Sequence, residues 1–127
     1  MSNQTKIENF STTPIRTIAL SKKVNLLELL PNVESQEIFT WVRNNQGLVA
    51  WGVKTKEEFI GKERFSRAHR WWKDFVDNCA IRDEVQTLGS GAISFVSFSY
   101  EIEDSSVVVV PQIIVGQNAE STWLTII

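Results

Sequence analysis

The stretch that decides the fold runs from Glu37 to Val53 and reads EIFTWVRNNQGLVAWGV. Two segments rich in β-branched and aromatic residues, Glu37–Arg43 and Leu48–Val53, flank the turn-forming sequence NNQG. This pattern is typical of a β-hairpin. Side chains alternate between the two faces of a strand, so Phe39 and Trp41 share one face and are expected to pack there. The hairpin predicts an antiparallel sheet.

Downstream of the hairpin, the sequence predicts an amphipathic helix over Lys62–Cys79. Apolar residues recur there at intervals of three and four positions, while the charged residues fall elsewhere, over about five helical turns. Trp72 and Phe75 are the expected core anchors, and Trp71 lies at the margin of the apolar stripe. The helix is therefore expected to pack on one face of the sheet.

The segment between hairpin and helix, Lys54–Ile60, has two interpretations. Thr55-Lys56-Glu57-Glu58 matches a capping box, so the helix could begin there. Equally, the strand could continue and break at Gly61. The later helix start is preferred.

The remaining elements follow from alternation, apolar runs and turn residues. We expect strands at 15–20, 92–101, 106–115 and 121–127, a short helix at 24–30 that Asn25 caps and Pro31 stops, and a loop at 81–90. Val107–Val110 predicts a strand buried on both faces, with Pro111 at a bulge or beside an edge. The fold class is α+β: an antiparallel sheet of about six strands with the 62–79 helix on one face. Residues 1–13 are expected to form a flexible arm, and 14–127 a single α+β domain.

Composition limits the class of protein. The 127 residues carry a net charge of −2, with 43% hydrophobic and 22% charged residues, which fits one soluble domain and argues against disorder. Cys79 is the only cysteine, so a disulfide scaffold is excluded and a cytoplasmic location is expected. The N-terminus does not resemble a signal peptide, and the longest apolar run is far below the roughly 20 residues of a membrane helix. No membrane partner is predicted.

Positive charge is concentrated in Lys54–Asp74, which holds seven basic and four acidic residues. A basic helix raises the hypothesis of nucleic-acid binding. The interleaved acids and the acidic remainder of the chain oppose a phosphate backbone. We therefore interpret this segment as a solvated helix face and predict no nucleic-acid partner.

Candidate chemical groups are few, and each has a structural interpretation. His69 could act as a general base, but it lies at the margin of the helix stripe. Cys79 is expected to be a small core residue, and the Gly89-Ser90-Gly91 segment a turn. The acidic groups could bind a divalent cation but stand in loops or turns, where carboxylates are usually solvated: Asp83, Glu84, Glu101, Glu103 and Asp104. We assign no catalytic, cofactor-binding or metal-binding residue.

Several stretches, taken in order, resemble the N-terminal region of isochorismate synthases of the actinobacterial type, members of the chorismate-binding enzyme family. The resemblance extends from about Ile15 to Ile127, and its specificity comes from the collinear order of the segments. The segments are Gly47–Gly52, Gly61–Ala68, Trp71-Trp72, Arg82–Val85, Gly89–Tyr100, Val108–Pro111, Val115-Gly116 and Trp123–Thr125.

The resemblance implies an isomerase that converts chorismate to isochorismate with Mg²⁺, for menaquinone, siderophore or salicylate synthesis. It also implies that the catalytic lysine, the catalytic glutamate and the Mg²⁺-binding glutamates lie in a C-terminal chorismate-binding region beyond Ile127. This chain would then be an incomplete half of the layered chorismate-binding fold, catalytically inactive by itself, with no cofactor of its own. Its expected partners are that missing C-terminal region and, through unpaired strand edges, a second copy. The alternative is a non-enzymatic α+β module for protein interaction or dimerisation.

Overall fold

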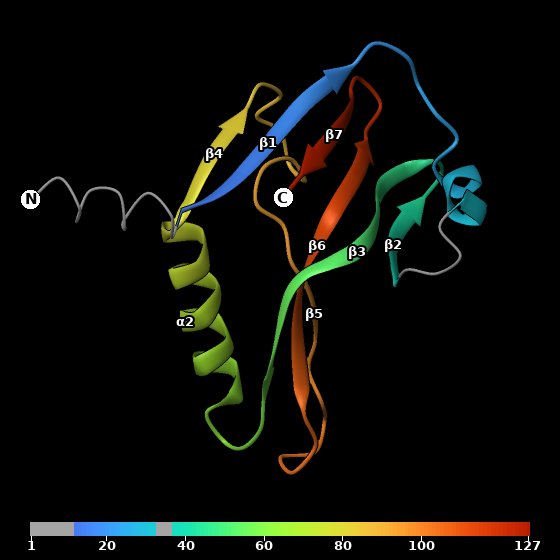
Figure 1. The fold of residues 1–127 in the computed structure, drawn as a ribbon. Coiled ribbons are helices and arrows are strands. Elements are labelled where there is room, and N and C mark those ends of the chain that lie inside the picture. The colour runs from blue at the N-terminus through green and yellow to red at the C-terminus, as the bar shows by residue number, and fades with distance from the viewer. Residues whose placement is uncertain (1–11, 33–36) are drawn as a thin grey trace, which may run out of the picture.

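The computed structural model describes residues 12–32 and 37–127 (Figure 1). The described residues contain one α-helix, one 3₁₀ helix and seven strands, joined by turns and loops. In chain order they are β1 (Thr13–Leu20), η1 (Leu26–Asn32), β2 (Ile38–Arg43), β3 (Gln46–Phe59), α2 (Arg64–Asp77), β4 (Cys79–Asp83), β5 (Phe95–Ser97), β6 (Ser106–Gln117) and β7 (Thr122–Ile126). No helix among them has the length and apolar character needed to cross a membrane.

The strands form one sheet in the order β2-β3-β6-β7-β1-β4, with β5 also paired to β6. All pairs are antiparallel except β1 with β4. The long strand β6 is central: β3 follows one side of it, while β5 and β7 share the other side (Figure 1). The predicted α+β class and mostly antiparallel sheet are confirmed, with seven strands in place of about six.

The hairpin of β2 and β3 is confirmed, with a tighter turn than expected. Asn44 and Asn45 have φ angles of 53° and 57°, so two residues make the turn in the type I′ geometry that suits twisted strands. The strand β3 continues to Phe59 and ends before Gly61, which confirms the later helix start. Pro111 of β6 lies opposite Val53, where the register with β3 shifts, so its missing N–H falls at an irregular point of the ladder.

Two groups of buried side chains form the core on either side of this irregularity. Leu26, Val49 and Val115 make one group near η1, and Phe59, Ala68 and Val108 make the other, beneath α2. As predicted, Val108, Val109 and Val110 are all buried. Trp123 is also buried, whereas Trp41 is 78% exposed, so the expectation that Trp41 packs in the core is wrong.

The segment expected to be the 81–90 loop instead begins with β4. Cys79–Asp83 pairs in parallel with Thr13–Thr17 of β1. This pairing joins segments more than sixty residues apart in the sequence. Because Ala80, Ile81 and Arg82 are all exposed, β4 lacks the alternation of apolar and polar residues that would mark it as a strand. The sheet is therefore mixed at this edge.

The strand expected at 92–101 is reduced to the three residues of β5. Beyond it, the backbone N–H of Ser99 donates to Ser106 Oγ at 2.8 Å in place of a partner carbonyl. This side-chain contact ends the ladder, and the chain turns through the acidic segment Glu101–Asp104 as predicted, with Asp104 N–H bonded to the Glu101 carbonyl.

The helix α2 is shorter than the predicted 62–79 range. Asn78 ends it, with its amide Nδ2 donating to the Asp74 carbonyl at 2.9 Å, and Cys79 already belongs to β4. Trp71, expected at the margin, packs against the core group of Phe59. Trp72 and Phe75, the expected core anchors, are partly buried, as Trp71 is.

The N-terminal segments also differ from prediction. The short helix at 24–30 is the 3₁₀ helix η1, which extends through Pro31 to Asn32. Of the flexible arm predicted for residues 1–13, residues 1–11 lie outside the described residues, and Thr13 begins β1.

Candidate functional site

The candidate site is a groove of about 340 Å³ between α2 and the β5–β6 hairpin. Such a volume lies at the small end of ligand-binding cavities. Its lining is apolar apart from one imidazole and one hydroxyl group. The lining residues are Phe65, Ala68, His69, Trp72, Ser94, Val96, Phe98 and Val108.

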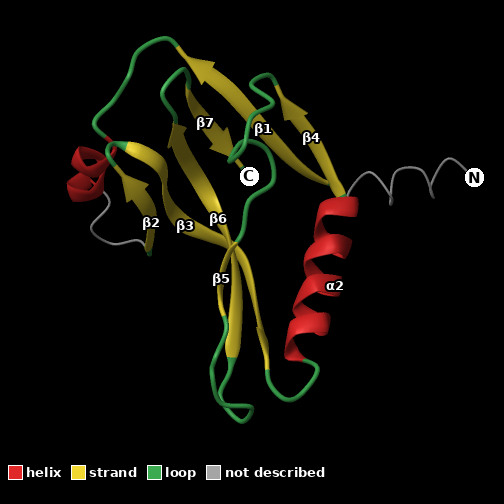
Figure 2. Cartoon of the chain, turned by 180° about the vertical axis from the view of Figure 1, so that it is seen from behind, coloured by secondary structure: helices red, strands yellow, loops and turns green. Residues whose placement is uncertain are grey.

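Regular backbone geometry brings these residues together. On α2 they stand at spacings of three and four, so they share one face of the helix. On the hairpin, Val96 is paired with Val108, and alternation places Ser94 and Phe98 on the same face as Val96. Figure 2 shows α2 beside the arm formed by the end of β3, β5 and the start of β6. The groove follows the line where helix and hairpin meet.

An aromatic pair closes the end of the groove near the start of α2. The rings of Phe65 and Phe98 lie 4.5 Å apart between centroids, at a tilt of 52°. Phe65 is 50% exposed and Phe98 44%, and neighbouring Val96 is 48% exposed. The groove therefore presents apolar side chains to solvent.

A buried arginine holds this end of the groove together. Arg64, counted above among the bases of a solvated helix face, is only 7% exposed. Its Nη1 donates to the Gly61 carbonyl at 3.0 Å and its Nη2 to the Ser99 carbonyl at 3.2 Å, while its Nε has no hydrogen-bond partner. The Gly61 N–H also donates to the Ile102 carbonyl. Arg64 thus joins the turn before α2 to the loop after β5.

Replacing Arg64 by alanine is expected to lower the free energy of unfolding by about 2 kcal/mol, because the buried side chain is lost, the Ser99 carbonyl loses this donor, and the Gly61 carbonyl keeps only the backbone N–H of residue 64. Arg70→Ala, at an exposed position of the same helix, is the matched control and should change stability by less than about 0.5 kcal/mol. Urea unfolding followed by circular dichroism measures both. Equal stability of the two variants would contradict the role of Arg64.

The structure does not bring the predicted candidate residues into one site. His69 lines the groove, whereas Cys79 lies in β4, where its thiol donates to the Phe75 carbonyl at 3.1 Å and burial raises its pKa. Glu84 accepts the N–H of Ala19 at 2.7 Å. Across residues 12–32 and 37–127, no group of three or more His, Cys, Asp or Glu side chains could hold a metal ion.

Asp83 organises the turn after β4. Its Oδ1 accepts the N–H groups of Val85 and Gln86, each at 2.9 Å, and its Oδ2 accepts the hydroxyl of Ser90 at 2.5 Å. Desolvation by burial raises the pKa of Asp83, but the hydrogen bonds from Gln86, Ser90 and Val85 outweigh it and lower the pKa. The hydrogen-bond partners of the carboxylate all belong to the turn, so the role of Asp83 is structural.

The lowered pKa of Asp83 predicts a pH-dependent stability. The ionised carboxylate stabilises the fold above its unfolded-state pKa of about 4, and this contribution is lost as pH falls through the lower folded-state pKa. Asp83→Asn keeps an acceptor but removes the charge, so it should cost about 1 kcal/mol at pH 7 and little at pH 2. Thermal unfolding across pH measures this, with Asp77→Asn on the exposed end of α2 as control. A constant cost at both pH values would contradict the assignment.

A second structural device lies at the other end of β6. Gly116 is paired with Trp123 of β7, whose indole covers it, and a Cβ at this glycine would lie closer than 3.0 Å to the ring. Trp123 Nε1 donates to the Gly89 carbonyl at 3.2 Å, which attaches the loop after β4 to the sheet. Thr17 Oγ1 continues this attachment by accepting the Gly91 N–H at 3.0 Å.

Reasoning from the sequence missed the groove and Arg64. The groove was detectable in part, because the spacing of Phe65, Ala68, His69 and Trp72 marks one helix face. Its second wall depends on the pairing of β5 with β6, which the sequence does not specify.

The chain matches no known family model, and no significant similarity is found to a curated protein or to a solved structure.

Proposed function

We propose that the chain is the N-terminal structural part of an isochorismate synthase, with the chemistry carried by a chorismate-binding region on another stretch of polypeptide. One observation carries the proposal: three of the stretches that resemble this family each hold a residue whose position the fold restricts. Gly116 lies beneath Trp123, Asp83 closes its turn with Ser90, and Arg64 is buried between two loops. Each of these residues has a structural role, which supports the proposal that this chain is the structural part of the enzyme.

The chemistry of the reaction favours the same division. Moving a hydroxyl group on chorismate needs an activated water, an acid for the departing oxygen and a cation that holds the carboxylates. The groove offers His69 and Ser94 among apolar side chains, which suits a packing surface better than this reaction. The resemblance to isochorismate synthases implies that the Mg²⁺ ligands belong to the other region, so we assign the cation to that region and no step to this chain.

An assay of isochorismate formation tests the proposal. The purified chain is incubated with chorismate and Mg²⁺, alone and together with the separately expressed chorismate-binding region of an actinobacterial isochorismate synthase, and products are separated by chromatography. We expect no isochorismate formation by the chain alone. When both parts are present, we expect more isochorismate than the chorismate-binding region forms by itself. Turnover by the chain alone would overturn the division of roles.

The alternative function, a non-enzymatic α+β module for protein interaction or dimerisation, is supported by a different observation. The groove leaves Phe65, Val96 and Phe98 half exposed, and contiguous apolar surface of this kind often marks an interface. Among the strands that the structure describes, β2 and β4 lie at the two ends of the sheet order, so each has one edge with no described partner. A stable self-association with no gain in turnover in the mixed assay would favour this alternative.

A further inference from the structure

The strand β2 lies at one end of the sheet order, and within residues 12–32 and 37–127 its one strand partner is β3. Figure 1 shows β2 on the side of the molecule opposite α2. Sheets usually protect such an edge from other strands with a charge, a proline or a bulge. The segment Ile38–Val42 has no charged residue and no proline, and its register with β3 is unbroken. This edge therefore lacks the features that keep an edge strand from pairing.

One hydrogen bond shows which backbone groups of β2 face the open side. The Gly52 N–H donates to the Glu37 carbonyl at 3.0 Å, so the backbone groups of Glu37 point toward β3. In an antiparallel pair this direction alternates, so every second residue from Glu37 to Arg43 also faces β3. The residues between them direct their N–H and C=O groups away from β3: Ile38, Thr40 and Val42.

We propose that β2 pairs with β2 of a second copy of this chain, antiparallel about a twofold axis that passes beside Thr40, so that one sheet continues through both copies. Thr40 then lies opposite Thr40 of the second copy, and Ile38 lies opposite Val42. All three outward-facing residues exchange hydrogen bonds in this register. Moving the register by two residues in either direction would set one of the three opposite a residue outside β2.

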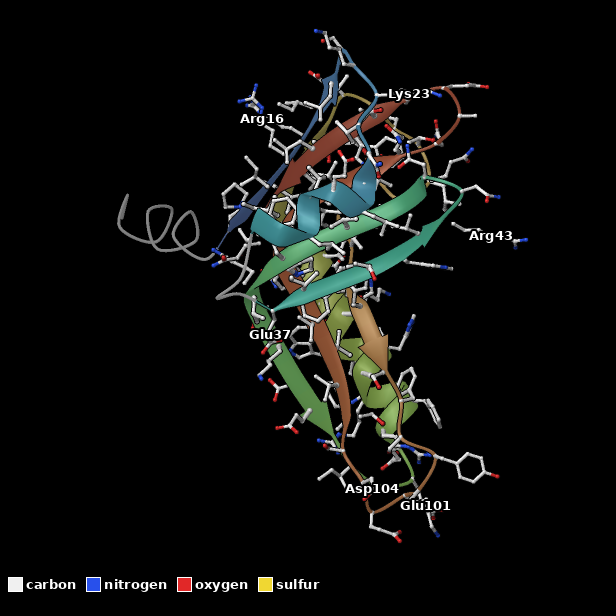
Figure 3. The ribbon with its side chains drawn as sticks, turned by 90° about the vertical axis from the view of Figure 1, so that its right-hand side faces the viewer. Arg16, Lys23, Glu37, Arg43, Glu101 and Asp104 are labelled. Atoms are coloured by element: carbon white, nitrogen blue, oxygen red, sulfur yellow. The ribbon has the colours of Figure 1, made fainter. Side chains whose placement is uncertain are left out.

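The charges of the hairpin fit the same register. Glu37 and Arg43 are the only charged residues between Glu37 and Val53, and both are exposed. Figure 3 shows them at opposite ends of β2. Pairing centred on Thr40 sets Glu37 of each copy opposite Arg43 of the other, so two pairs of opposite charge form by symmetry. Lys54, the next charged residue along the chain, stands on β3, one strand further from the second copy than Glu37 is.

The aromatic residues of β2 fit this register as well. Phe39 lies opposite Trp41 of the second copy, in a pair without mutual hydrogen bonds, where side chains approach most closely. The Phe39 ring is already stacked on Phe95, with the ring centroids 5.3 Å apart. Trp41 is 78% exposed in the single chain. Pairing would cover this indole on both copies against the Phe39 and Phe95 rings.

The strand at the other end of the sheet order is not complementary to itself in this way. Antiparallel pairing of β4 about Ile81 would set Cys79 opposite Asp83 and Ala80 opposite Arg82, with no pair of opposite charge. The match of backbone groups, charges and aromatic rings in β2 therefore favours a second copy as the occupant of its edge over a strand of unrelated sequence. Because the contact is one strand wide, we expect a reversible monomer–dimer equilibrium.

Sedimentation velocity of the full chain over a range of concentrations tests the pairing. Thr40→Pro removes the N–H groups at the twofold axis but no hydrogen bond to β3, so it should abolish the dimer and leave the chain folded. Thr40→Val keeps the N–H and the branched side chain, and is the matched control that should still dimerise. Circular dichroism confirms that both variants are folded.

Charge reversal tests the register. Glu37→Arg and Arg43→Glu each set like charges opposite each other at both symmetric pairs, so each should raise the dissociation constant about tenfold. The combined variant restores opposite charges and should recover the lost affinity. Lys73→Glu, an exposed reversal on α2, is the matched control and should leave the dimer unchanged.

A chain that stays monomeric at all concentrations would overturn the proposed pairing of β2. A dimer that Thr40→Pro fails to dissociate, or that the combined charge variant fails to restore, would overturn it as well. Self-association is measured independently of isochorismate formation, so failure of the pairing and failure of the proposed function are distinguishable.

Discussion

Alanine at Gly116 is expected to lower the free energy of unfolding by about 3 kcal/mol, one of the two largest effects that we expect from a single substitution in this chain. A Cβ there would lie closer than 3.0 Å to three atoms of the Trp123 indole. That ring cannot move aside easily, because Trp123 is 1% exposed and its Nε1 is bonded to the Gly89 carbonyl. The strain would fall where β6, β7 and the loop after β4 meet.

A double-mutant cycle with Trp123→Leu isolates this steric cause. Leucine removes the ring, so Gly116→Ala should cost less than about 1 kcal/mol in that background. Chemical unfolding followed by far-ultraviolet circular dichroism measures all four proteins. Gln112→Ala, at an exposed position of β6, controls for a change on the same strand. An equal cost of Gly116→Ala in both backgrounds would show that the indole is not responsible.

The second large effect is expected at Gly47, where alanine should also cost about 3 kcal/mol. Its φ of +127° is a conformation that side-chain-bearing residues rarely adopt, and its Cβ would collide with the backbone carbonyl oxygen of Trp41. Backbone atoms cannot turn away as a side chain can. The substitution should therefore disrupt the pairing of Val42 with Gly47, one position from the pair that closes the hairpin.

Damage at Gly47 is expected to reach beyond the hairpin. Asn45 in the turn accepts the Leu26 N–H at its Oδ1 and donates from its Nδ2 to the Val24 carbonyl, each at 2.9 Å. Gln117 of β6 donates to the Asn45 carbonyl at 2.8 Å, so the turn anchors the start of η1 to the sheet. Hydrogen exchange should show loss of protection at the Leu26 amide.

Gln46→Ala is the matched control for Gly47→Ala, since Gln46 is the exposed neighbour of Gly47 at the start of β3. It should leave stability within about 0.5 kcal/mol of the natural sequence and keep the Leu26 amide protected. Retention of full stability by Gly47→Ala would contradict the proposed backbone constraint.

The parts of the fold that could be predicted have strong local signals. The β2–β3 hairpin combines β-formers with a turn sequence, α2 has helical spacing, and β6 contains the unbroken run Val107–Val110. β4 could not be predicted in this way, because its residues are mostly exposed and its order comes from parallel pairing with distant β1. A local sequence pattern reflects only the burial of residues that are close together in the sequence, so it does not reveal pairing with a distant strand.

The candidate site was less predictable than the fold. The groove needs α2 and β5 side by side, and β5 is held by three residues of pairing with β6. Arg64 belongs by composition to a basic helix, yet the loop around Ser99 folds over it and supplies a carbonyl partner. Trp41 shows the opposite outcome: aromatic type predicted burial, but β2 lies at the end of the sheet order and the Trp41 side chain is 78% exposed.

If this chain is the structural part of an isochorismate synthase, as we propose, the DNA that follows the codon for Ile127 should encode a chorismate-binding region, either in frame or after a frameshift. Sequencing of that DNA checks this expectation. Downstream DNA that encodes no such region in any frame would be evidence against the proposal and would leave the interaction module as the better description of the protein.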